Sequence, residues 1–114
     1  MAIPLSQKQR AFTRMLADLI QFAYEQGYEL TVGDAFRDPR LYGEHGTKKG
    51  YGSSKSVHKL RLAMDLNLWV DGKYIQTSDH PAWDELHNHW ESIGGAERVP
   101  NDANHFSLEH WGYR

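Results

Sequence analysis

The chain has 114 residues, of which 39% are hydrophobic and 25% are charged, and its formal net charge is −2 at pH 7. These values predict a single globular domain over residues 1–114 and exclude an intrinsically disordered chain. The sequence contains no cysteine, so disulfides and thiolate ligands are excluded, and any metal ion must be held by nitrogen and oxygen atoms.

The N-terminal residues 1–8 lack the apolar core of a signal peptide. No stretch approaches the roughly 18 apolar residues of a membrane span. We therefore expect a protein that has no signal peptide, does not insert into a membrane and is made in the cytoplasm.

The first element expected is a helix from about Ser6 to Gln26. Apolar residues recur there at helical spacing, Ser6 and Gln9 form a capping-box pattern, and Gly27 ends the run. Residues 28–33 predict a short strand.

The middle of the chain predicts a turn and a long loop. The turn is expected at Asp38-Pro39, and residues 41–55 hold four glycines with little periodicity. Long ordered loops in small domains are often functional, so this loop is a candidate for part of a site.

A strand over residues 62–70 follows, because apolar and polar positions alternate with a period of two. Asp65 then lies on the face opposite the core residues Leu62, Met64, Leu66, Leu68 and Val70. The turn signal Asp71-Gly72 leads to a second short strand at residues 73–76.

The last elements are a helix and a strand. Thr77, Ser78 or Asp79 is expected to cap a helix that has Pro81 at an early position and ends at Gly94-Gly95. Residues 105–109 alternate again, with Phe106 and Leu108 inward. The order of elements predicts a small α+β domain, in which helices pack on a short antiparallel sheet.

Basic residues are concentrated between Arg37 and Arg61, where seven basic side chains stand against two acidic ones. Such a run suits an anionic partner or is simply a solvated loop. Nucleic acid is a poor candidate, because aromatic residues are not interleaved with the charges and the whole chain is negative.

Three residues have the chemistry of a metal site. His58, Asp65 and His105 supply two imidazoles and one carboxylate, which is the number of protein ligands in a catalytic zinc site with one open position. Asp102 precedes His105 by three residues and is placed to act as a general base without binding the metal. The other histidines are expected to be ordinary surface residues: His45, His80, His87, His89 and His110.

The joint pattern resembles a known family. S-x-H followed by A-x-D, with seven positions from His to Asp, and D-x-x-H near the C-terminus resemble zinc peptidases of the LAS type, which include D-Ala-D-Ala carboxypeptidases and dipeptidases. The chain is most similar to the small phage endolysins that cut the L-alanyl-D-glutamate bond of peptidoglycan. The resemblance spans Tyr28 to Glu109 and includes A-M-D-L-N-L and N-H-F-S-L.

The resemblance implies roles for particular residues. His58, Asp65 and His105 would hold zinc in a cleft on the open face of the sheet, and Asp102 would be the catalytic base. Arg37, in A-F-R-D-P, matches an arginine that holds the substrate or stabilises the oxyanion, and Ser56 matches a serine that supports the first ligand. One position departs from the pattern, because Arg61 stands where the family often has glycine, and this leaves open which bond is cleaved.

As a whole, the resemblance implies a monomeric endolysin that hydrolyses the peptidoglycan stem peptide and reaches the cell wall only after the host membrane has been permeabilised. Two alternatives stay open. One is a D,D-carboxypeptidase or dipeptidase that releases D-Ala, and the other is a cell-wall binding module without catalysis.

Overall fold

The computed structural model describes residues 3–35, 57–110 and 112–114. The predicted turn at Asp38-Pro39 and the predicted loop over residues 41–55 lie outside these residues. So do Arg37, Ser56 and His45.

The N-terminal helix α1 spans Leu5–Glu25, close to the predicted range. Its buried stripe follows the helical period and consists of Phe12, Leu16, Leu19 and Ala23. Gly27 follows the helix with a φ of 85°, a backbone conformation that glycine adopts without steric cost.

The predicted capping box of α1 is wrong. Pro4 occupies the cap position, and no side chain caps the helix. The amide of Gln9 instead donates a hydrogen bond of 2.8 Å to the carbonyl of Leu60. A long-range partner has therefore replaced the local bond that the sequence pattern indicated.

The sheet is organised around strand β2, Ala63–Val70, and every pairing in it is antiparallel. Strand β1, Glu29–Val32, pairs with one edge of β2. The other edge of β2 is shared by β3, Lys73–Tyr74, and β4, His105–Ser107. The short 3₁₀ helix η1, Val57–Leu60, leads into β2.

Helix α3 spans Pro81–Ser92, and the residue that caps it was not among the predicted ones. His80 is the cap, and its Nδ1 accepts a hydrogen bond of 3.0 Å from the backbone N–H of Ala82. The predictions of Thr77, Ser78 or Asp79 are thus wrong by one to three positions. Pro81 occupies the early position expected of it.

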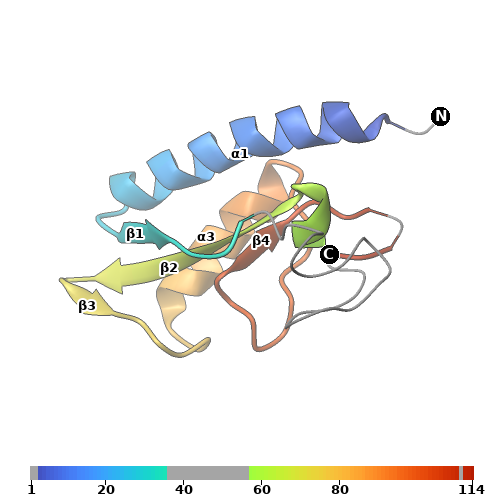
Figure 1. Ribbon diagram of the computed structural model, residues 1–114. Helices are drawn as coiled ribbons and strands as arrows, with labels where there is room; N and C mark the ends of the chain where they lie inside the picture. Colours follow the sequence, from blue (N-terminus) through green and yellow to red (C-terminus); the bar gives the residue numbers. More distant parts are fainter. Residues whose placement is uncertain (1–2, 36–56, 111) are drawn as a thin grey trace.

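The core lies between the two helices and the sheet. In Figure 1, α1 runs along one side of the sheet and α3 passes behind β2. Leu66 and Leu68 of β2 are buried with Trp83, Leu86 and Trp90 of α3, while Asp65 and Asn67 keep part of their surface exposed. The alternation predicted for this strand is confirmed from Asp65 to Leu68, whereas Ala63, which was expected on the face opposite the core, is buried as well. The α+β class is confirmed.

Two strand predictions need adjustment. β3 ends at Tyr74 rather than residue 76, and β4 ends at Ser107 rather than residue 109. All three residues of β4 are buried, so His105 and Ser107 do not lie on a solvent face. Asp71 and Gly72 form the expected turn, with φ values of 53° and 76°. Neither helix has the length and apolar character needed to cross a bilayer, within the described residues.

Candidate metal centre

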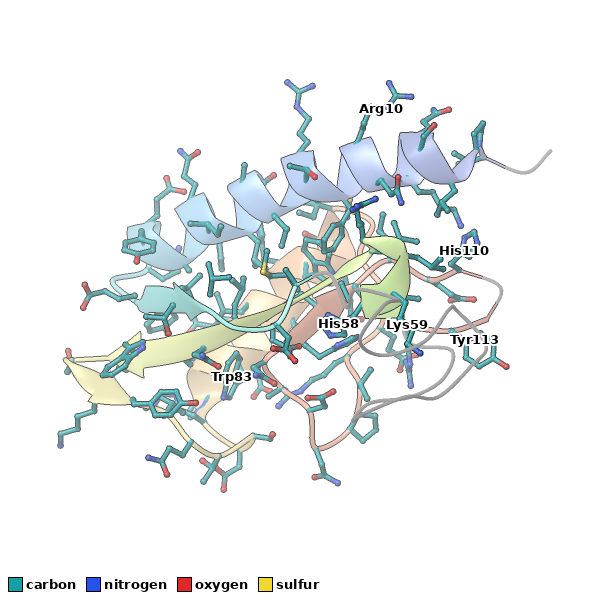
Figure 2. The ribbon with its side chains drawn as sticks, viewed as in Figure 1. Arg10, His58, Lys59, Trp83, His110 and Tyr113 are labelled. Carbon is teal, nitrogen blue, oxygen red and sulfur yellow. The ribbon has the colours of Figure 1, made fainter. Side chains whose placement is uncertain are left out.

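A hydrogen bond to a backbone carbonyl holds the ring of His58 in position. His58 lies in η1 with only 2% of its surface exposed, and it projects from η1 on the side away from α1 (Figure 2). Its Nδ1 is 2.7 Å from the carbonyl oxygen of Ala35. A carbonyl only accepts, so Nδ1 carries the hydrogen and Nε2 of the neutral ring presents a lone pair.

Asp65 and His105 are brought together by strand pairing. They are directly opposite each other in the register of β2 and β4. Asp65 Oδ1 lies 3.3 Å from His58 Nε2 and 3.6 Å from His105 Nδ1. The two ring nitrogens are 3.2 Å apart. Residues 47 positions apart in the chain thus share one small site.

The electrostatics of this site favour a cation. Burial by itself would raise the pKa of Asp65, but its close polar contacts with His105 and His58 outweigh burial and lower that pKa to about 2. The carboxylate is therefore ionised at neutral pH. Its Oδ1 is buried and has no hydrogen-bond partner of good geometry among the described residues, which leaves it able to bind an ion.

One ligand atom from each of His58, Asp65 and His105 lies within 4.8 Å of the other two. The group is thus close enough to bind a metal ion, as the sequence predicted. Two imidazoles and a carboxylate suit zinc and also other divalent ions, so the donor set does not fix the identity of the metal. His105 Nε2 is also buried and lacks a hydrogen-bond partner within the described part of the chain.

Asp102 lies beside this group without belonging to it. Its carbonyl accepts a hydrogen bond of 3.1 Å from the backbone N–H of His105, so a single turn separates the two residues. The side chain is exposed and lines a pocket of about 190 Å³. This placement leaves its carboxylate accessible to a bound molecule.

The structure supplies a reason for the glycine expected at position 61. Arg61 follows η1 with a φ of 56°, in the left-handed region that glycine adopts most easily. Its side chain is exposed. The departure from the family pattern therefore concerns backbone conformation at the start of β2, and an effect on substrate choice stays a prediction.

The surface prediction for the other histidines is wrong for two of them. His87 and His110 are buried, with 2% and 7% of their surface exposed. His87 Nε2 lies 2.6 Å from the carbonyl of Ala103, and its ring stacks on Phe106 at a centroid distance of 4.2 Å. A signal existed in the sequence, because His87 falls four residues after Trp83 and three before Trp90, on the buried stripe of the helix.

His80 and His89 have structural roles elsewhere in the fold. His80 caps α3, and His89 Nε2 lies 2.8 Å from Asp18 Oδ1, which joins α3 to α1. Among the described residues, neither histidine contacts His58, Asp65 or His105.

Known proteins give no further guidance on the site. No protein-family model matches the chain, and no curated protein sequence matches it.

Proposed function

We infer that this protein is a zinc-dependent peptidase that hydrolyses the stem peptide of peptidoglycan, in the manner of LAS-type endolysins that cut the L-alanyl-D-glutamate bond. The observation that carries the proposal is the convergence of His58 Nε2, Asp65 Oδ1 and His105 Nδ1, with Asp102 one turn away. These are the residues to which the sequence pattern assigns the ligands and the base.

The donor set fits the metal that this function requires. His58 has its Nδ1 hydrogen bound to Ala35, so its lone pair is directed at the other two ligands. Asp65 contributes the negative charge, and its buried Oδ1 lacks another partner among the described residues. These residues would hold a zinc ion, which would supply a Lewis acid for the scissile carbonyl and would acidify water.

The chain's own residues would perform the proton transfers. Asp102 is exposed at the edge of the pocket, where its carboxylate can take a proton from the attacking water and then deliver it to the leaving amine. Arg37 would stabilise developing negative charge or hold a substrate carboxylate. Arg37 lies outside the described residues, so its role rests on the sequence pattern alone.

The test combines metal analysis with mass analysis of digested muropeptides. The purified protein is expected to hold about one zinc ion per chain and to separate L-Ala from D-Glu. Release of D-Ala instead would favour the D,D-carboxypeptidase or dipeptidase. Sedimentation with sacculi without new amino groups would favour a binding module.

Two variants separate the roles of the residues. Asp102→Ala is expected to keep zinc and fold but to lose cleavage, whereas His58→Ala is expected to lose both zinc and cleavage. Undiminished cleavage by Asp102→Ala would show that Asp102 is not the base.

A further inference from the structure

A polar pocket is lined by residues that lie close in the chain to two members of the candidate metal site, Asp65 and His105. Asn67 lines it and lies two residues after Asp65, so both side chains are on the same face of β2, about 7 Å apart along the strand. Asp102 lines the same pocket from the segment that precedes β4. We call this cavity the amide pocket, after the carboxamide side chains in its wall: Asn67, Gln76, Asn101 and Asn104.

Hydrogen bonds hold the walls of the amide pocket in place. Ser78 Oγ accepts a bond of 3.3 Å from the N–H of Ala103, which ties the two rims together. The indole of Trp83 donates to the carbonyl of Thr77 at 2.9 Å, and Arg98 donates to the carbonyl of Ser78 at 2.5 Å. A pocket held in this way loses little conformational entropy when a ligand binds.

The lining of the amide pocket is polar but almost uncharged. Among the described residues that form it, Asp102 alone carries a charge, and that charge is negative. Asn104 Nδ2 donates to Asn67 Oδ1 at 3.4 Å, which uses one of the several donor and acceptor positions of each amide. Such a lining suits a neutral ligand rich in hydroxyl and amide groups and disfavours a carboxylate.

An aromatic wall completes the pocket. Tyr74 lines it with 45% of its surface exposed and packs against Trp69 at a centroid distance of 5.3 Å. A supported aromatic ring offers a rigid apolar surface next to hydrogen-bonding groups. This combination matches the alternating C–H and hydroxyl surfaces of a sugar ring.

We propose that the amide pocket is the subsite for the N-acetylmuramyl end of the substrate, on the acyl side of the scissile bond. The proposal rests on the proposed function, because it takes the stem peptide as the substrate. On that side of an L-alanyl-D-glutamate bond the substrate is an N-acetylated sugar joined by a neutral amide, whereas the amine side carries carboxylates. Because the charge of the amide pocket comes from Asp102 and is negative, the pocket would repel the carboxylates of the amine side. The uncharged acyl side of the substrate is compatible with it.

The experiment compares two substrates that differ only in the sugar. Cleavage of N-acetylmuramyl-L-Ala-D-Glu and of acetyl-L-Ala-D-Glu is followed by mass spectrometry, and kcat/KM is measured for each. Gln76→Ala and Tyr74→Ala probe the pocket. Arg10→Ala is the control, because Arg10 points outward from α1, away from the sheet (Figure 2).

The native protein is expected to prefer the muramyl substrate. Each pocket variant should lower kcat/KM for that substrate by roughly three- to tenfold, the effect of one lost hydrogen bond or packing contact, and leave the acetyl substrate within about twofold. Arg10→Ala should change neither value. Equal rates on the two substrates, or a preference that survives both pocket substitutions, would overturn the proposal.

A binding measurement separates this proposal from the proposed function. N-acetylmuramyl-L-alaninamide lacks the scissile bond, and its binding is followed through the side-chain amide NMR signals of Asn67 and Asn104. If neither substrate is cleaved but these signals shift saturably, and less so in Gln76→Ala, the pocket proposal stands while the proposed reaction fails. If the signals do not move, the pocket proposal fails whatever the enzymatic result.

Discussion

Nδ1 of His58 lies 2.7 Å from the carbonyl oxygen of Ala35. This single contact fixes which ring nitrogen carries the hydrogen, and so it aims the lone pair of Nε2 at Asp65 and His105. Ala35 lies just beyond the end of β1, next to Asp34. The carbonyl of Asp34 accepts a hydrogen bond of 2.7 Å from the backbone N–H of Asp65. The segment that continues β1 beside β2 thus orients the ring of His58 and anchors the backbone of Asp65.

The charge of Asp65 is expected to dominate metal affinity. Asp65→Asn keeps the shape of the side chain but removes the charge from a buried site. Zinc affinity should therefore fall by at least about 100-fold, because loss of a residue that only supports a ligand already lowers metal affinity by up to about that factor. Competition with a chromophoric chelator measures this change. Asp71→Asn is a matched control in the exposed β2–β3 turn, where asparagine tolerates the φ of 53°. Similar affinities for the two variants would remove Asp65 from the ligand set.

His87 should make stability depend on pH. Burial lowers the pKa of His87 to about 4, while the unfolded chain keeps the ordinary value near 6.5. Between these values the unfolded chain takes up a proton that the folded chain refuses. The free energy of unfolding therefore falls as the pH drops through this window, by about 2 kcal/mol at pH 5 and about 3 kcal/mol below pH 4.

Urea unfolding of the metal-free protein at pH 8 and pH 5 tests this linkage. His87→Gln serves as the comparison, because glutamine can donate to the Ala103 carbonyl but does not titrate. The loss of stability from His87 should disappear in this variant. An identical pH profile for both proteins would mean that His87 titrates alike in the folded and unfolded chains.

Position 61 should prefer glycine to alanine. The φ of 56° places a side-chain-bearing residue in the left-handed region, at a cost of about 1–2 kcal/mol, part of which is offset by the greater freedom of glycine in the unfolded chain. Arg61→Gly is therefore expected to be more stable than Arg61→Ala by about 1 kcal/mol. Both variants lack the guanidinium, so their difference in chemical denaturation isolates the backbone. Equal stabilities would show that the local backbone relaxes to accommodate a Cβ.

Gly95 should not tolerate a side chain. A Cβ there would lie against the indole nitrogen of Trp90, inside van der Waals contact. The indole is fully buried and donates to the carbonyl of Ser107 at 2.9 Å, so it cannot move without breaking that bond.

Gly95→Ala is expected to lower the free energy of unfolding by about 1–3 kcal/mol or more, as measured by chemical denaturation. Glu91→Ala, on the exposed face of α3, is the control and should stay within about 0.5 kcal/mol. A Gly95→Ala protein as stable as the control would mean that the Trp90 side chain has room to shift.

Local periodicity was enough to locate most of the elements. Each of these two elements buries one face. In α1 the buried face repeats apolar residues about once per helical turn, and in β2 it repeats them at every second residue. The same periodicity placed Asp65 on the face opposite Leu66 and Leu68. Helix caps were predicted less well: Gln9 is bound to the distant carbonyl of Leu60, and His80 caps α3 locally although histidine is not among the usual capping residues.

The sequence by itself determined the kinds of ligand, since the chain has no cysteine and the side chains of His58, Asp65 and His105 offer a metal only nitrogen and oxygen. Only the tertiary structure decided that these atoms converge, because the pairing of β4 with β2 sets Asp65 opposite His105. It also decided that Ala35 fixes the tautomer of His58 and that the ring of His87 stacks on Phe106. These contacts join segments far apart in the chain, and their geometry follows from how the sheet and helices pack as a whole rather than from any local repeat.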